Sequence, residues 1–162
     1  MIREFKGKRP KISNAIVDEL AILIGNVIIK DGANIWPHAM LRADEEEIII
    51  EENVAILEKA FIEAPKKVVI GKNSVISHGA IIHGATIGEN VLIGIGAIVL
   101  EVNVGKNSII AAGSVVTKDI EENSFVAGVP AKKLRGIKEE EIKKIKEIVE
   151  ELKEKARYLK MG

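Results

Sequence analysis

Two histidines and one glutamate are the residues of this chain whose types and spacing are best suited to holding a metal ion. His78 and His83 lie five residues apart in the segment SHGAIIHGATIG, and Glu63 precedes His83 by twenty residues. The chain has no cysteine, which excludes disulfides, thiolate-ligated zinc and iron–sulfur clusters. Two imidazoles and one carboxylate form a donor set that serves both catalytic zinc and non-haem iron. Whether these side chains can share an ion depends on the fold that positions them.

Aliphatic residues recur every six positions along most of the chain, and a small or β-branched residue follows most of them four positions later. A period of six fits neither an amphipathic α-helix nor a heptad repeat, but it fits a flat strand followed by a corner. The register slips by one residue after Ile82 and again after Val99. The aliphatic positions are Leu23, Ile29, Ile35, Leu41, Ile50, Ile56, Ile62, Ile70, Ile76, Ile82, Ile87, Ile93, Val99, Val104, Ile110 and Val116.

Three six-residue faces make one triangular coil of about eighteen residues, and successive coils stack at the inter-strand spacing of about 4.7–4.9 Å. We therefore predict an all-β fold, a left-handed parallel β-helix of hexapeptide repeats that spans residues 1–136. A β-sandwich would instead show a period of two, with clusters of turn residues about every 8–12 positions. The steps from Leu41 to Ile50 and from Ile62 to Ile70 exceed six residues, so we expect short loops there.

The segment 137–162 has a different pattern, with apolar residues at alternating steps of three and four. This pattern predicts one amphipathic helix of about twenty residues with a narrow apolar stripe. We expect the helix to pack on the outside of the β-helix or on a neighbouring subunit; a free-standing coiled coil is the alternative.

The repeat places the candidate ligands relative to one another. His78 is two positions after its anchor Ile76 and His83 is one after Ile82, so the two histidines lie on different faces of the coil. One subunit cannot easily bring both to one ion, but neighbours packed about a threefold axis can. Glu63 also follows its anchor by one position, one coil earlier, so it should stack on His83 with the two Cβ atoms about 5 Å apart.

The chain resembles the γ-class carbonic anhydrase family of hexapeptide proteins in four stretches, namely IWPHAMLRAD (35–44), ISHGAIIHGATIGENVLIGIGAIVL (76–100), IIAAGSVV (109–116) and VAGVPAKKLR (126–135). The paired H-G-A-x-x-H-G is the most specific part. The glycine-rich hexapeptides and the V-x-G-x-P-A-K tail are shared with hexapeptide acyltransferases. The resemblance covers nearly the whole chain.

The resemblance implies a homotrimer whose metal sites lie between subunits, with zinc as the expected divalent metal and iron(II) or cobalt as alternatives. The implied reaction is the reversible hydration of CO2 to bicarbonate by a metal-bound hydroxide. His78 matches the ligand lent by a neighbouring subunit, and His83 matches a ligand from the same chain. Arg42 and Asp44 match the family's Arg-Gly-Asp motif, here Arg-Ala-Asp, whose charges help organise the interface.

The chain departs from the family pattern at three positions close to the implied site. Glu63 stands where the family has its remaining histidine ligand, and Ala55 and Leu57 replace the two amides of its Asn-Ile-Gln-Asp motif. A carboxylate ligand cancels one unit of the metal's charge, so we expect a less acidic bound water and slower hydration. Loss of the amides removes hydrogen bonds that could hold the nucleophile and the developing bicarbonate.

Three further residues are weaker candidates. Glu58 takes the place of the motif's aspartate and either hydrogen-bonds a metal-bound water or pairs with a lysine. Glu45 opens an acidic run, 45–47, and is either a proton relay near the rim or a solvated charge. His38 is a solvated corner residue or a proton shuttle.

Composition narrows the function classes. The 162 residues include 24 basic and 24 acidic side chains, which does not favour nucleic acid as a partner, and no segment is apolar enough to span a membrane. We expect a soluble cytoplasmic protein that acts on CO2 and bicarbonate or another small anion. Two other functions stay open: a non-catalytic metal-binding or structural trimer, and an acyl-CoA-dependent acyltransferase. The short interruptions of the repeat argue against the long loop that most such acyltransferases have.

Overall fold

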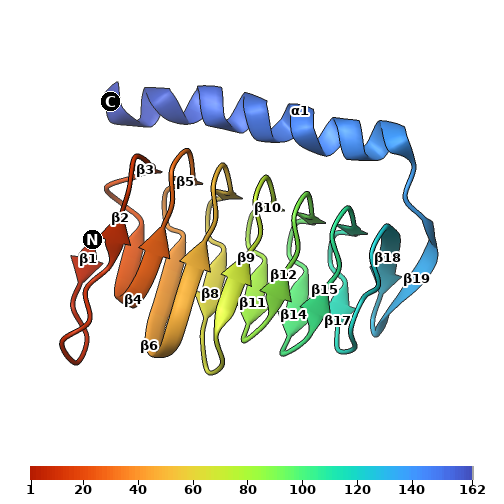
Figure 1. The fold of residues 1–162 in the computed structure, drawn as a ribbon, viewed down its shortest axis with the longest axis horizontal. Helices are drawn as coiled ribbons and strands as arrows, with labels where there is room; N and C mark the ends of the chain where they lie inside the picture. Colours follow the sequence, from red (N-terminus) through yellow and green to blue (C-terminus); the bar gives the residue numbers. More distant parts are fainter. Residues whose placement is uncertain (162) are drawn as a thin grey trace.

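The protein is a left-handed parallel β-helix with one C-terminal helix, as predicted, in a computed structural model that describes residues 1–161. Figure 1 shows the coils stacked side by side from the N-terminal to the C-terminal end of the solenoid. Two sheets form the three faces of the coils. No helix within the described residues is long and apolar enough to cross a membrane.

One face is the eight-stranded sheet, in which seven parallel strands stack, one per coil, and the last strand pairs antiparallel with its neighbour. Its strands are β3 (Ile16–Val17), β5 (Asn34–Ile35), β7 (Ala55–Ile56), β10 (Val75–Ile76), β13 (Leu92–Ile93), β16 (Ile109–Ile110), β18 (Ser124–Gly128) and β19 (Ala131–Gly136).

The other two faces belong to one eleven-stranded sheet, because the long strands β4 and β6 each run across both of them before the sheet divides into two rows. Its strands are β1 (Ile2–Arg3), β2 (Lys11–Ile12), β4 (Ile22–Ile29), β6 (Met40–Ile50), β8 (Phe61–Glu63), β9 (Val68–Ile70), β11 (Ile81–His83), β12 (Thr86–Ile87), β14 (Ile98–Leu100), β15 (Asn103–Val104) and β17 (Val115–Val116). The row β8, β11, β14 and β17 holds the candidate ligands Glu63 and His83.

The prediction of a short loop between Leu41 and Ile50 is wrong. Residues Met40–Ile50 form the continuous strand β6, and the extra residues are taken up by a register shift against β4 between Gly25 and Val27. The longer step therefore turns a corner without leaving the sheet. The second interruption does form a short connection, between β8 and β9.

The core consists of aliphatic columns that run along the solenoid axis. Leu41, Ile62, Ile82 and Val99 are paired in register through four successive coils and have no exposed surface. Removing one such side chain from water stabilises the fold by about 1.5–3 kcal/mol, and each column repeats that contribution once per coil. The predicted anchors are thus the core of the protein.

A ladder of asparagines lines one corner of the solenoid. Five consecutive coils place an asparagine there in the left-handed backbone region, with φ between 53° and 61°, a feature that the six-residue period of apolar residues does not predict. The amide nitrogen of Asn53 donates to Asn73 at 3.2 Å, and that of Asn90 donates to Asn107 at 3.2 Å. Asparagine suits this corner because it tolerates positive φ better than other side chains do. The five residues are Asn53, Asn73, Asn90, Asn107 and Asn123.

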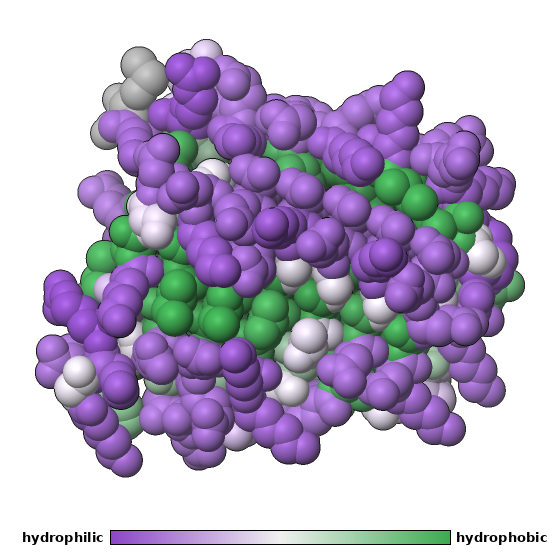
Figure 2. All heavy atoms as spheres, in the orientation of Figure 1, coloured by the Kyte–Doolittle hydropathy of each residue, from purple (hydrophilic) through white to green (hydrophobic). Residues whose placement is uncertain are grey.

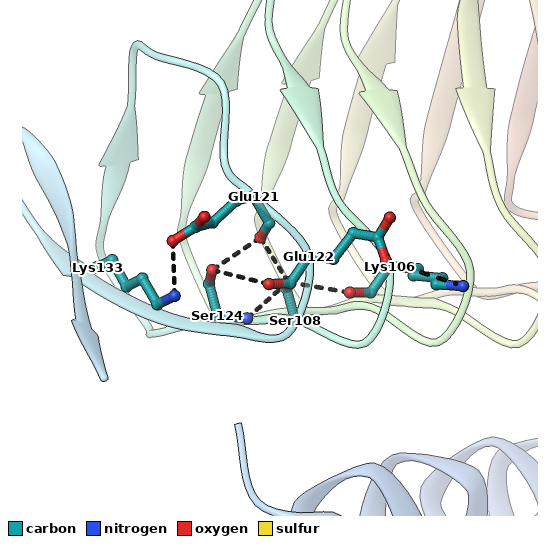
Figure 3. Close-up of polar contacts among 6 residues, drawn as sticks. All are labelled: Lys106, Ser108, Glu121, Glu122, Ser124 and Lys133. Carbon is teal, nitrogen blue, oxygen red and sulfur yellow. Dashed lines mark hydrogen bonds and ion pairs between the residues drawn. The ribbon is translucent and has the colours of Figure 1, made fainter. Parts of the chain in front are cut away.

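Buried serines satisfy backbone groups inside the last coils (Figure 3). The Ser108 hydroxyl accepts the Ser124 backbone N–H at 3.1 Å, and the Ser124 hydroxyl donates to the Glu121 carbonyl at 2.7 Å. Outside this corner, the Lys133 ammonium on β19 donates to the Glu121 carboxylate at 2.6 Å. These contacts tie the terminal hairpin to the final coil.

Helix α1 (Glu139–Ala156) packs along the eight-stranded face and continues into the 3-10 turn η1 (Arg157–Met161). Figure 1 shows that the helix runs back over the solenoid, so that the end of the chain lies over the N-terminal coils. Ile145 and Val149 bury against Ala55, Leu57 and Val75. The outward surface of the helix is hydrophilic in Figure 2, in agreement with a single apolar stripe.

The start of α1 is fixed by an ion pair with the last strand. Arg135 on β19 donates through both terminal nitrogens to the Glu141 carboxylate, at 2.7 and 3.0 Å, and the backbone N–H of Lys138 donates to the same carboxylate at 3.0 Å. The Arg135 hydrogen bonds hold the pKa of Glu141 at about 2, below its ordinary value of 4.5.

Because the pKa of Glu141 is lowered by folding, its contribution to the free energy of unfolding is complete above about pH 4.5 and is lost as the pH falls towards about 2. We expect Glu141→Gln to lower stability at neutral pH and to flatten the pH dependence of unfolding between these values. Urea denaturation followed by circular dichroism from pH 2 to pH 7 measures both effects. Glu140→Gln, in the same helical turn and exposed, is the matched control. An equal effect of both variants would contradict the assignment.

Candidate metal and catalytic site

Glu63 and His83 meet as the spacing predicts. They are directly opposite one another on the neighbouring strands β8 and β11, and His83 Nδ1 lies 2.7 Å from Glu63 Oε1. Both side chains point outward from the coil, because each follows a buried anchor residue in its strand. Stacking of one coil on the next is sufficient to bring this pair together.

Arg42 and Asp44 extend the same charged column on strand β6. Arg42 is opposite Glu63, and its guanidinium forms an ion pair with Glu63 Oε2. Arg42 Nε lies 3.4 Å from Asp44 Oδ2, and the guanidinium is 5.6 Å from the centre of the Phe61 ring. Both oxygens of Glu63 are therefore engaged within the chain, one by His83 and one by Arg42.

His78 has a glutamate partner of its own. It lies at the corner between β10 and β11, where its Nδ1 is 2.9 Å from Glu58 Oε2. The Gly79 backbone N–H donates to the Glu58 carbonyl at 3.0 Å, which fixes the two coils relative to each other at this corner. Glu58 precedes His78 by twenty residues, the same interval that separates Glu63 from His83. Both His–Glu pairs thus arise in the same way, from two residues that are one coil apart.

The donor set of these pairs fits a divalent cation. Each Nδ1 lies within ion-pair distance of a carboxylate, although Glu58 Oε2 forms no hydrogen bond with the described residues, and Nε2 is left as the nitrogen that can bind a metal. The imidazoles are accessible, with 51% of the His78 side chain and 36% of the His83 side chain exposed. Among residues 1–161 of one chain, however, no three His, Cys, Asp or Glu side chains come together around a common point. The described residues of one chain therefore provide no three-ligand site by themselves.

Other sequence candidates lie apart from these pairs. Glu45 is exposed on β6, and its side chain makes no hydrogen bond or ion pair with the residues that the structure describes. His38 is exposed at a corner with φ of 63°. Neither residue contacts a proposed ligand.

Ala55 and Leu57, which stand where the family has amides, serve the packing of α1. Ala55 has no exposed surface, Leu57 is 6% exposed, and both belong to the apolar cluster that Ile145 and Val149 of the helix complete. The side chains at these positions are thus committed to holding the helix, and they offer no hydrogen bond to a bound anion.

An apolar column beside the charged one was not recognised from the sequence. Each member points outward and is only half buried, and Met40, Phe61 and Ile81 lie two residues before Arg42, Glu63 and His83 of the charged column. Its signal was the aliphatic or aromatic residue that comes directly before each buried anchor. The column consists of Met40, Phe61, Ile81, Ile98 and Val115.

Comparison with known proteins defines the family. A probable carbonic anhydrase of Methanocaldococcus jannaschii is 41% identical over 139 residues, which cover 83% of this chain and 87% of that protein. The chain belongs to the γ-class carbonic anhydrase-like family. Residues 84–118 of the chain also match the family described as the hexapeptide repeat of succinyl-transferase.

Solved structures share the whole fold of this family member. A hexapeptide transferase family protein from Anaplasma phagocytophilum is 33% identical, with a TM-score of 0.94 over 97% of this chain and 96% of that one. A putative acetyltransferase of Bacillus cereus is 28% identical, with a TM-score of 0.96 over 100% of this chain and 98% of that one. The fold therefore accommodates proteins named for two different chemistries.

Restoring the family's glutamine should harm the fold. We expect Leu57→Gln to lower the free energy of unfolding by about 1–3 kcal/mol, because it places an unpaired amide in the apolar contact between α1 and the sheet. Thermal and urea denaturation measure the loss. Lys59→Gln, two residues away and exposed, should change stability little. A Leu57→Gln protein as stable as its parent would show that the helix contact is not the role of this residue.

Proposed function

We propose that the protein is a metal-dependent carbonic anhydrase-like enzyme that catalyses the reversible hydration of CO2 at the interface between two copies of the chain. The observation that supports this proposal is the pair of His–Glu contacts, in which His78 and His83 each turn Nδ1 to a carboxylate on the preceding coil. Together with membership of the family, this arrangement favours a site in which both imidazoles bind through Nε2.

In the proposed trimer, His83 of one copy and His78 of its neighbour hold a divalent ion, with Glu63 as the third candidate ligand. Zinc fits this set of donors, as do iron(II) and cobalt. The apolar column from Met40 to Val115 lies beside the charged one on the same face and gives the neighbouring copy an apolar surface to bury. Arg42 and Asp44 supply charges at the same face.

The contacts of Glu63 define what its two possible roles require. As a ligand, Glu63 must release His83 or Arg42, since both of its oxygens are engaged. If it keeps both contacts, it orients the His83 imidazole and offsets the Arg42 charge. Glu58 has the orienting contact with His78.

When bound, the ion would supply a water acidified to near neutral pH. The residues of the chain do the rest: Glu58 and Glu63 hold the imidazole rings, and the Arg42 guanidinium, which pairs with Glu63 and lies close to Asp44, holds the Glu63 carboxylate in place. Glu45, an exposed carboxylate on the neighbouring part of β6, exchanges protons with the solvent. The absence of amides at positions 55 and 57 predicts a slow reaction.

Acyl transfer from an acyl-coenzyme A is the second candidate. It is favoured by the similarity of the whole chain to a hexapeptide transferase family protein and to a putative acetyltransferase. The accessible imidazole of His78, oriented by Glu58, would then act as the general base that accepts a proton from the acyl acceptor. This mechanism requires no metal.

Metal binding separates these candidates first. We expect purified protein loaded with zinc to hold about one ion per chain, and His78→Ala and His83→Ala each to lose it, because each removes one of the two imidazole ligands. Elemental analysis after gel filtration measures the stoichiometry together with the size of the assembly. His38→Ala is the matched control and should bind metal normally. A monomer that binds no ion in the presence of zinc, iron(II) or cobalt would end the proposal.

Activity provides the second test. We expect slow, metal-dependent CO2 hydration in stopped flow, about tenfold or more faster in Glu63→His, because a third neutral imidazole restores the full charge of the ion. Glu63→Gln keeps an acceptor for His83 Nδ1, so it should retain metal if Glu63 only orients the ring and lose metal if it is a ligand. No hydration above buffer, together with saturable binding of coenzyme A in calorimetry, would favour acyl transfer instead.

A further inference from the structure

A cleft of about 500 Å³ lies between the end of the C-terminal helix and the first coils, and it includes none of the residues of the two His–Glu pairs. Figure 1 shows that the helix returns over the N-terminal coils and ends there. Its charged and polar walls come from Asn14, Asn34, Lys153, Arg157 and Lys160, with Glu150 and Glu154 also present. The volume is within the range of about 300–1,000 Å³ that holds small ligands.

Asn34 in this wall has an unsatisfied donor. The residue is only 1% exposed, and its Oδ1 accepts the Trp36 Nε1–H at 2.8 Å. Its Nδ2 is buried and has no hydrogen-bond partner among the described residues. Buried amide donors nearly always have an acceptor in folded proteins, so this one calls for an acceptor that the chain does not provide.

The cations of the cleft supply the complementary charge. Arg157 pairs with Glu154 at 2.9 Å, whereas Lys153 and Lys160 have no carboxylate partner within the part of the chain that the structure describes. Lys153 donates one hydrogen bond, to Asn53 Oδ1 at 3.0 Å, and keeps two further N–H donors. Basic residues at a helix C-terminus complement its dipole, but the dipole does not account for the unpaired Asn34 amide.

Gly32 keeps the cleft open beside Lys153. It lies at the corner where the next coils have the asparagine ladder, with φ of 78°. A Cβ at Gly32 would lie 2.2 Å from Asn53 Oδ1 and 3.4 Å from Lys153 Cε. A side chain there would therefore disturb the contact that holds the Lys153 ammonium at the cleft.

We propose that this cleft binds a small phosphate monoester. The phosphate group lies between Lys153, Arg157 and Lys160, and an oxygen of the ligand accepts the free N–H of Asn34. Ala15, Ile16 and Ala33 contact its carbon atoms. A doubly charged phosphate suits two unpaired lysines and a guanidinium better than a single carboxylate does. The site is separate from CO2 chemistry and needs no metal.

The single tryptophan of the chain reports on this site, because Trp36 is hydrogen-bonded to Asn34. We expect titration of metal-free protein with glycerol 3-phosphate to change the Trp36 emission saturably, with matching heat in calorimetry. Glycerol at the same concentrations, with chloride at matched ionic strength, should have no such effect. No saturable response to glycerol 3-phosphate would overturn the proposal.

Variants locate the binding. We expect the double change Lys153→Ala and Lys160→Ala to weaken the affinity about tenfold or more, and the control double change Lys143→Ala and Lys146→Ala, equal in charge and on exposed positions, to leave it unchanged. Asn34→Asp keeps the acceptor for Trp36 but removes the donor, and it should abolish binding. Equal weakening by both lysine pairs, or full affinity in folded Asn34→Asp protein, would refute the cleft as the site.

Discussion

Each coil must lie in register on the coil before it, and the rest of the molecule depends on this constraint. Parallel strands from successive coils share their hydrogen bonds, so a residue faces its counterpart one coil away at the inter-strand distance. The buried columns make a shift of register costly, because a slip of one residue would expose every anchor. Chemistry on the surface inherits this regularity: Glu58 meets His78 and Glu63 meets His83 because both pairs are one coil apart.

This regularity explains what could be predicted. The period of six gave the fold, the core and the Glu63–His83 contact, since each follows from counting residues along a repeated path. The strand β6 was mistaken for a loop because the count does not show whether extra residues leave the sheet or turn within it. The partners of Arg42 and the burial of Leu57 also required the structure, because they depend on side-chain orientation and on where a distant helix packs. The asparagines of the ladder recur in the sequence at one position per coil, but the reason for asparagine there, a corner with positive φ, is seen only in the structure.

The helix links the stability of the solenoid to the chemistry that the family can perform on it. The positions that carry amides in the family are here Ala55 and Leu57, and they form the surface on which Ile145 and Val149 pack. A change that favours helix packing thus removes hydrogen-bonding groups next to the corner of Glu58 and His78.

The terminal hairpin has a consequence for how these molecules behave at high concentration. A stack of parallel strands presents at its end a row of unpaired backbone groups that a second solenoid could extend, which is the route to fibres. Strand β19 reverses the chain direction against β18, and it contains Lys132, Lys133 and Arg135. On this sheet, an incoming parallel strand would meet a strand of the opposite polarity whose exposed side chains are charged. The hairpin therefore caps the C-terminal edge of the eight-stranded sheet against extension by a parallel strand.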